Sequence, residues 1–179
     1  MRLLNLSESH PYLSAFTQLY IDAFPADEKK PVGMLFLLQS KGVADIFALD
    51  DSGFCGLAVT LKGSAAVIVD YLAVSSDMRG LGCGSAALRL LREKYGAKLI
   101  FEIEAAVPYA ENAAQRKKRR DFYLKNGLLP TEIFVNVYNT DMELLSFSPL
   151  NYEEYLSVLK EAGDDLYKTA NPKLLPRLY

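Results

Sequence analysis

The sequence contains no tryptophan, one histidine and two cysteines among its 179 residues. With only His10, a metal site built from several histidines is excluded, and a catalytic triad would have to use this residue near the N-terminus. The two cysteines, Cys55 and Cys83, lack metal-ligand spacing and do not form the disulfide framework of a small secreted domain. We therefore expect reduced cysteines and a chemistry that relies on carboxylates, tyrosines and backbone dipoles.

Long hydrophobic runs and a charge excess of one sign are also lacking. No stretch approaches the roughly 18 apolar residues of a membrane span, and the N-terminus has no long apolar segment after Arg2. Twenty basic against 22 acidic side chains give a net charge of −2, so no global positive field attracts nucleic acid or anionic lipid. We expect a cytoplasmic protein forming a single domain over residues 1–179, with neither nucleic acid nor membrane as a partner.

The apolar pattern predicts alternating strands and helices. Helices are expected at 11–24, 31–39, 85–95, 112–126 and 152–162, and strands at 1–6, 43–49, 54–61, 65–74, 98–104, 128–138 and 142–147. Glycine-containing turns join the three strands between 43 and 74, which predicts an antiparallel meander. Strand, helix and strand from 65 to 104 predict one βαβ unit with a parallel pair.

The order of these elements predicts the α/β (mixed α+β) class. We expect a mixed, mostly antiparallel twisted sheet of about seven strands with helices on both faces. The tail after Asp165, which contains two prolines, is expected to be irregular.

The most informative segment lies between the strand at 65–74 and the helix at 85–95. It consists of Arg79, Gly80, Leu81, Gly82, Cys83, Gly84 and Ser85. Its three glycines are expected to let the backbone approach a ligand closely and to take positive φ. The unpaired N–H groups and the dipole at a helix start favour negative charge, and the arginine adds a cation. This segment is predicted to bind an anion such as a pyrophosphate.

Two motifs resemble those of the GNAT superfamily of acetyl-CoA-dependent N-acetyltransferases. Arg79, Gly82 and Gly84 match its acetyl-CoA signature: Arg or Gln, two residues, Gly, one residue, then Gly or Ala. About 40 residues later, the segment 120–128 resembles the superfamily's Phe-Tyr-x-x-x-Gly-Phe sequence, with Leu128 in place of the usual aromatic residue. Together the motifs cover the core from about residue 43 to residue 140.

The resemblance implies direct transfer of an acetyl group from acetyl-CoA, as co-substrate, to an amine. It implies that the backbone N–H groups of Leu72, Ala73 and Val74 stabilise the oxyanion, a role that fixed dipoles suit well. It also assigns to Tyr123 the protonation of the departing thiolate. No metal takes part in this chemistry.

The proton of the acceptor amine, whose ordinary pKa is about 10.4, can be removed by a carboxylate. Asp70 interrupts an apolar strand, and some polyamine acetyltransferases of the superfamily have an acid at the matching place. Glu104 is the other candidate, and it alternates with Glu102 so that both face one side of the sheet. The residues leave the choice between Asp70 and Glu104 open.

One position departs from the superfamily pattern. Many members have an asparagine seven residues before the tyrosine, where this chain has Arg116, and Asn112 lies one turn earlier. We therefore do not carry that cofactor contact over. Arg116 either reaches a phosphate or is solvated, and the basic run 116–120 is interpreted as a solvated helix face.

Two other functions remain as alternatives. Gly82 to Ala87 also fit the G-x-G-x-x-A pattern of a Rossmann site for NAD, but seven residues separate Val74 from Gly82, whereas a Rossmann glycine follows its strand almost directly. A CoA-binding module without turnover is the non-enzyme alternative. A homodimer is common in the superfamily, and the residues do not decide it.

The acceptor amine is not specified by the sequence. The first 40 residues and the C-terminal helix normally wall the acceptor pocket in this superfamily, and here they offer acidic residues such as Asp22, Asp27 and Glu28. Polyamines, aminoglycosides, amino acids and protein amines all stay open.

Overall fold

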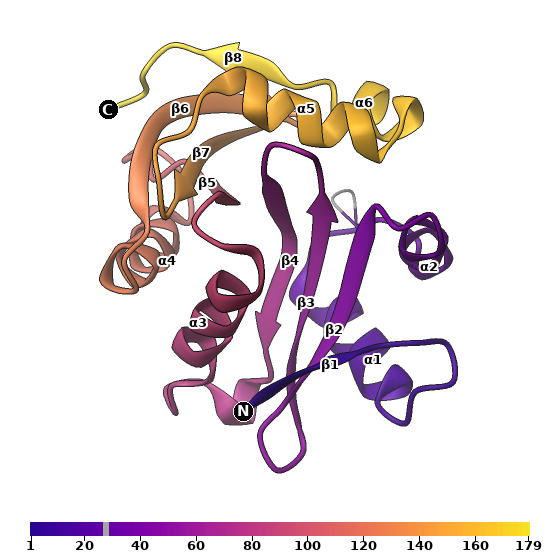
Figure 1. Ribbon diagram of the computed structural model, residues 1–179. Coiled ribbons are helices and arrows are strands. Elements are labelled where there is room, and N and C mark those ends of the chain that lie inside the picture. Colours follow the sequence, from indigo (N-terminus) through magenta and orange to yellow (C-terminus); the bar gives the residue numbers. More distant parts are fainter. Residues whose placement is uncertain (27–28) are drawn as a thin grey trace. The chain divides into compact units, whose positions relative to one another are not determined.

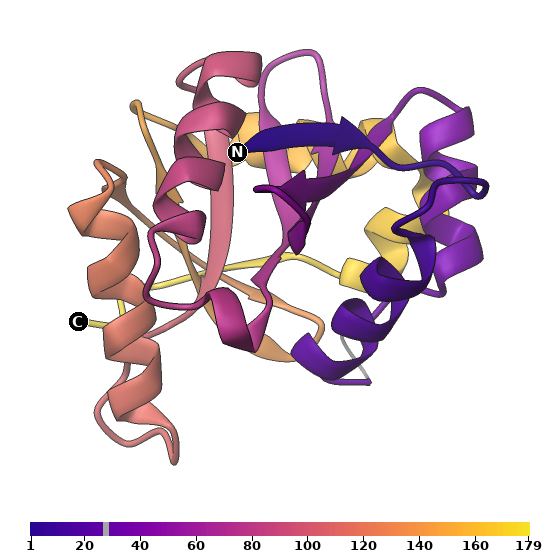
Figure 2. The same ribbon diagram turned by 90° about the horizontal axis from the view of Figure 1, so that it is seen from below.

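The computed structural model describes residues 1–26 and 29–179 (Figures 1 and 2). Asp27 and Glu28, which the sequence suggests for the acceptor pocket, lie outside the described residues. The chain divides into two compact units, the first formed by Met1–Lys62 with Val69–Gly96 and the second by Gly63–Ile68 with Ala97–Tyr179. The single domain stays a prediction.

The first unit contains strands and helices that follow the predicted order. Its elements are β1 (Arg2–Asn5), α1 (Leu13–Ala23), α2 (Val32–Ser40), β2 (Ala44–Asp50), β3 (Phe54–Lys62), most of β4 (Val67–Val74), the short 3-10 helix η1 (Ser76–Met78) and α3 (Cys83–Tyr95). Strand β1 pairs with β2, and β2 pairs with β3, both antiparallel. The predicted hairpin between the strands at 43–49 and 54–61 is thus confirmed.

The core of the first unit lies between its strands and the two N-terminal helices. Helix α1 buries Phe16 and Tyr20, which are four residues apart and therefore share one helix face. These rings pack in a cluster with Leu35 of α2 and Ile46 of β2. Gly56 of β3 fits only as glycine, because a Cβ there would lie 2.4 Å from the carbonyl oxygen of Ala73. The missing side chain lets β3 lie close to the end of β4.

The second unit combines an antiparallel set of strands with three α-helices. Its further elements are β5 (Leu99–Glu104), α4 (Ala113–Lys125), β6 (Leu129–Val137), β7 (Thr140–Ser146), α5 (Tyr152–Ala162), α6 (Asp164–Ala170) and β8 (Lys173–Leu175). The strands follow the order β5-β7-β6-β8, and each neighbouring pair is antiparallel. Helix α5 begins with a capping box, in which Asn151 and Glu154 exchange side-chain and backbone hydrogen bonds.

The prediction of an irregular tail after Asp165 is wrong. The tail forms α6 and then β8, in which Leu175 lies opposite Phe134 of β6. A three-residue strand has no periodicity of its own, and this one exists because a distant strand offers it a free edge.

The predicted α/β class is confirmed. The described residues form eight strands and six α-helices, one strand more than expected because of β8. The parallel pair of the βαβ unit stays a prediction. Across the described residues, no helix is both long and apolar enough to cross a membrane.

Candidate active site

The glycine segment leads from β4 through η1 into α3 (Figure 2). Gly80 and Gly82 take φ values of 80° and 87°, in the left-handed region that glycine reaches without strain, as predicted. The prediction of positive φ is wrong for Gly84, which lies in the first turn of α3. The helix starts two residues earlier than expected because Gly82 itself caps it in the left-handed conformation.

The start of α3 leaves backbone donors unpaired. Its first hydrogen bond runs from the Ala86 N–H to the Gly82 carbonyl oxygen, at 3.0 Å. Within the described residues, the N–H groups of Cys83, Gly84 and Ser85 have no acceptor, and no side chain caps the helix. A Cβ built on Gly82 would meet nothing within 4 Å. Three free donors, the helix dipole and open space together suit a phosphate group.

Arg79 lies beside these donors in sequence and contacts the end of β4. Its Nε donates to the Val74 carbonyl oxygen at 3.2 Å, and the side chain is exposed. No other partner of this guanidinium occurs in the described part of the chain. Its remaining N–H groups are therefore available to an anion.

The segment Leu72–Val74, predicted to stabilise the oxyanion, is the half-buried end of β4. The next residue, Ser75, donates its backbone N–H to the Cys55 carbonyl oxygen of β3 at 3.0 Å. This bond and the contact at Gly56 fix the end of the strand. The role of the three N–H groups stays a prediction.

Asp70 of β4 lies in a buried ion pair. The Nζ atom of Lys30 lies 2.8 and 2.9 Å from its two carboxylate oxygens, and the two side chains are only 7% and 8% exposed. Two tyrosines hold the Lys30 backbone: Tyr71 accepts from its N–H at 3.1 Å, and Tyr20 donates to its carbonyl oxygen at 3.0 Å. Burial raises the pKa of both phenols. The candidate base is therefore already bound to a primary ammonium group.

In the second unit, Tyr123 lies near the end of α4. Its ring packs on Phe101 of β5, with the centroids 5.2 Å apart, and on the adjacent Phe122. Its hydroxyl has no hydrogen-bond partner in the described residues. Burial raises the pKa of Tyr123 to about 12, although the positive charge of Arg119 opposes the shift. The phenol is therefore protonated at neutral pH and has a proton to donate.

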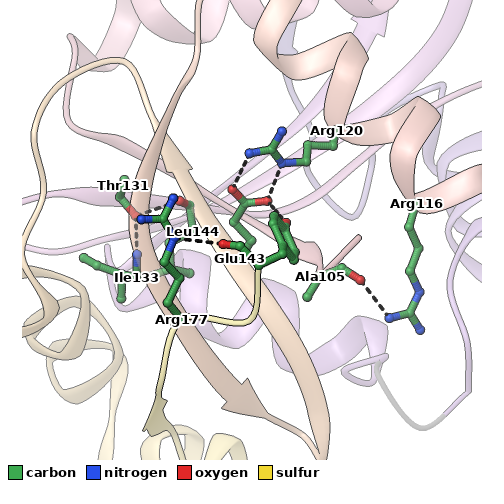
Figure 3. A network of polar contacts seen from close by, with 9 residues as sticks. Ala105, Arg116, Arg120, Thr131, Ile133, Glu143, Leu144 and Arg177 are labelled. Atoms are coloured by element: carbon green, nitrogen blue, oxygen red, sulfur yellow. Dashed lines mark hydrogen bonds and ion pairs between the residues drawn. The ribbon is translucent and has the colours of Figure 1, made fainter. Parts of the chain in front are cut away.

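Glu104 of β5 lies between two arginines of α4. Arg116 Nη2 is 2.9 Å from one carboxylate oxygen, and Arg119 Nη1 is 2.7 Å from the other. Arg116 also donates to the carbonyl oxygen of Ala105 at 3.2 Å (Figure 3) and to Asn112 Oδ1 at 2.6 Å. Arg116 is thus neither solvated nor free.

Glu102 and Glu104 do not act as a pair. Glu102 accepts from the Tyr155 hydroxyl of α5 at 2.5 Å, whereas Glu104 binds arginines of α4. The interpretation of the run 116–120 as a solvated face is wrong for Arg116 and Arg120, whose side chains are 18% and 23% exposed and bind carboxylates. Arg119 is 41% exposed and also contacts a carboxylate. Arg116 and Arg120 lie one turn apart and Arg119 adjoins them, so the three share the helix face that meets the carboxylates.

Comparison with known proteins shows which sequences and folds the chain resembles. No family model matches the sequence. The Bacillus subtilis (strain 168) protein named "Putative acetyltransferase YjbC" is 28% identical over 161 residues, covering 84% of this chain and 80% of that protein. The Bacteroides thetaiotaomicron structure "Putative acetyltransferase from GNAT family" has a TM-score of 0.71 at 20% identity and covers 86% of this chain and 90% of its own. The chain is thus similar to a named acetyltransferase in sequence and has the fold of a GNAT-family structure.

A further solved structure has the same fold with a ligand. The spermidine N-acetyltransferase of Vibrio cholerae, solved with CoA and spermine, has a TM-score of 0.61 at 10% identity, over 87% of this chain and 97% of its own. The Rossmann alternative is wrong, because a GNAT fold surrounds the glycine segment and η1 separates the strand from Gly82.

One buried polar cluster was not predicted from the sequence. Glu143 of β7 is 1% exposed and accepts two hydrogen bonds from Arg120 of α4 (Figure 3). It also accepts a hydrogen bond from the Tyr179 hydroxyl. The available signal was a charged residue inside the apolar run from Met142 to Phe147. A buried carboxylate requires a charged or hydrogen-bonding partner, and the sequence does not indicate which cationic side chain pairs with Glu143.

Proposed function

We propose that this acetyltransferase transfers the acetyl group of acetyl-CoA to a primary amine, with residues 79–85 binding the pyrophosphate and Tyr123 as the acid. The observation that carries the proposal is the open start of α3. Three unpaired N–H groups follow two left-handed glycines, next to an arginine with free donors. The Vibrio cholerae relative, whose structure contains CoA and spermine, supports acetyl-CoA as co-substrate and a small amine as acceptor.

In the proposed reaction, the neutral amine nitrogen attacks the thioester carbon, and the carbonyl electron pair moves to the oxygen. The N–H groups of Leu72–Val74 stabilise this oxyanion by hydrogen bonds that fixed dipoles supply without reorganisation. When the intermediate collapses, the carbon–sulfur bond breaks and the thiolate leaves. The proton lost by the amine passes to a carboxylate and balances the proton that the thiolate gains.

The raised pKa of Tyr123 defines how it acts. A phenol with a pKa of about 12 is a much weaker acid than a thiol of pKa about 8.5. Tyr123 therefore stabilises the departing thiolate first by a hydrogen bond. The thiolate then takes the phenol proton. The proton that the carboxylate accepted from the amine restores the phenol.

Asp70 and Glu104 both remain candidates for the proton acceptor. Asp70 already binds the ammonium of Lys30 in buried surroundings, a contact that an acceptor amine can replace chemically. The variants Asp70→Asn and Glu104→Gln distinguish the two, since removal of the base lowers kcat most at low pH, where the amine is protonated. Because Asp70→Asn also removes the carboxylate that Lys30 contacts, the double variant Lys30→Met/Asp70→Asn is its matched control.

The test of the proposed function is a thermal-shift titration with acetyl-CoA, run beside NADH. Ligand at 100 times its Kd stabilises a protein by about 2.7 kcal/mol, which in a chain of this size raises Tm by roughly 5 to 10 °C. We expect this shift with acetyl-CoA and none with NADH. Thiol release with spermidine, kanamycin and an alanine-terminated peptide then identifies an acceptor. No shift with acetyl-CoA would contradict the proposal.

A further inference from the structure

Helix α4, which carries Tyr123, is held in an unusual way. None of its side chains is fully buried in the described structure. Most protein helices are fixed by an apolar face packed against a core. Here the contacts of Arg116, Arg119 and Arg120 with carboxylates and a carbonyl oxygen take over much of this task. The placement of the Tyr123 hydroxyl therefore depends on polar contacts.

The contact nearest to Tyr123 along the helix is that of Arg120, one turn earlier. Its Nε and Nη2 atoms donate to the Glu143 carboxylate at 2.7 and 3.0 Å, a two-pronged geometry that restricts the rotation of the helix (Figure 3). The Glu143 carboxylate is buried and also accepts from the Tyr179 hydroxyl. The Arg120 guanidinium lies over the Tyr179 ring, 5.5 Å from its centroid. Tyr179 thus contacts both partners of the ion pair.

The chain before Tyr179 ties this residue to the rest of the second unit. Strand β8 pairs with β6, and the Tyr179 ring meets Phe134 edge-on with the centroids 5.2 Å apart. Leu175 and Leu178 pack on an apolar cluster that includes Val107, in the segment leading from β5 to α4. The segment 173–179 therefore contacts both the approach to α4 and the carboxylate that anchors it.

We propose that Tyr179 is a positioning residue for the reaction: through Glu143 and Arg120 it sets the rotation of α4 and so the place of the Tyr123 hydroxyl. The inference rests on the proposed role of Tyr123 as the acid. The Tyr179 hydroxyl orients the buried Glu143 carboxylate, which orients Arg120. Loss of this hydroxyl leaves the fold and the acetyl-CoA segment intact, and it loosens the helix that carries the acid.

The decisive variant is Tyr179→Phe, which keeps the ring contacts with Phe134 and Arg120 and removes the hydrogen bond to Glu143. Its matched control is Tyr95→Phe, which removes a tyrosine–carboxylate bond in the first unit, where Tyr95 donates to Asp45 at 2.5 Å. We expect Tyr179→Phe to lower kcat about tenfold, since small misplacements of catalytic groups are costly. The Kd of acetyl-CoA should stay within twofold, and Tyr95→Phe should keep the wild-type kcat.

A double-mutant cycle separates positioning from a general structural effect. If Tyr179 acts through Tyr123, then Tyr179→Phe lowers kcat no further in a Tyr123→Phe background. Equal losses in both backgrounds would overturn the proposal. The amine for these assays is the acceptor found among spermidine, kanamycin and the alanine-terminated peptide.

Hydrogen exchange tests the same idea without an acceptor. In Tyr179→Phe, deuterium uptake should rise in peptides covering α4 and stay unchanged in peptides covering α3. Unchanged uptake in α4 would overturn the positioning proposal whether or not Tyr123 is the acid. Conversely, a wild-type kcat in Tyr123→Phe would contradict the proposed function, and the exchange data would still decide whether Tyr179 holds α4.

Discussion

Helices α3 and α4 each have 13 residues, and each carries one part of the proposed site, yet they are held in opposite ways. Helix α3 buries Cys83, Ala87, Leu88 and Leu91 and presents bare backbone donors at its start. Helix α4 buries no side chain fully and is anchored by arginine–carboxylate pairs. The proposed ligand-binding helix is thus held by apolar packing, whereas the helix of the candidate acid is held mainly by charged side chains.

The difference shows which changes each part tolerates. A site made of backbone N–H groups survives most side-chain substitutions, provided that the glycines keep their conformation. A side chain placed by ion pairs is sensitive to the loss of a single charge, because the partner carboxylate is buried. Substitutions in the two helices should therefore have effects of different size and kind.

The largest effect is expected from Arg120→Met, which leaves the buried carboxylate of Glu143 without its cation. Breaking a buried pair by removing one partner costs about 3 to 5 kcal/mol, and the Tyr179 hydroxyl offsets part of this, so we expect a loss of about 3 kcal/mol. Urea unfolding measures it. Lys118→Met is the control, since it removes an exposed charge from the same helix. An equal effect of both variants would show that α4 is not anchored by this pair.

A somewhat smaller effect is expected on the free energy of unfolding at alkaline pH. Folded Tyr123 keeps its proton up to about pH 12, whereas a tyrosine in the unfolded chain releases it near pH 10. Between these values the unfolded state binds fewer protons, so stability falls as pH rises, by about 2 kcal/mol from this residue. Tyr123→Phe should lose less stability than the wild type between pH 10 and 12 in urea titrations. Parallel curves for the two proteins would refute the burial of this phenol.

The next smaller effect is a loss of acetyl-CoA affinity caused by a substitution in the glycine segment. Gly82→Ala forces a side chain into left-handed backbone, at a cost of about 1 to 2 kcal/mol, and should weaken acetyl-CoA binding about tenfold in calorimetry. Gly96→Ala is matched to it, because Gly96 ends the same helix with a φ of 82° and open space around it. This control should lose stability and keep its affinity. Similar affinities for both variants would place the ligand elsewhere.

The smallest effect is expected for the exposed pair Arg89–Glu93 of α3, 3.1 Å apart, whose side chains are 65% and 58% exposed. Glu93→Gln should change the free energy of unfolding by no more than about 0.5 kcal/mol. Chemical denaturation checks this value. A loss approaching that of Arg120→Met would remove the contrast between surface and buried charge pairs.

The sequence predicted most elements because their signals are local. Helix α5 occupies 152–162 as expected, and α3 differs only by starting at Cys83, where Gly82 caps it. The tail was mispredicted because β8 forms by pairing with a distant strand. Pro31, expected as the first residue of a helix, instead precedes it as the cap residue, with a non-helical ψ of 137°.

The part of the candidate site that consists of backbone groups could be predicted from the sequence, whereas its long-range ion pairs could not. The positive φ of Gly80 and Gly82 was predicted because glycine reaches this conformation without strain, whereas anion binding by this segment stays a prediction. The ion pair of Asp70 with Lys30 was not predicted, because these residues are 40 positions apart. The contacts among Arg120, Glu143 and Tyr179 were not predicted either, because these residues come from a helix, a strand and the tail. Charge pairing at long range has no periodic signal.

In the proposed mechanism, the glycine segment binds acetyl-CoA while Tyr123 serves the chemical step. The most direct test is one measurement pair on Tyr123→Phe: the Kd of acetyl-CoA by calorimetry and kcat with the identified amine. We predict an unchanged Kd and a kcat about 100-fold lower, which is the usual contribution of an acid–base group. A wild-type kcat, or a loss explained entirely by weaker acetyl-CoA binding, would contradict the claim.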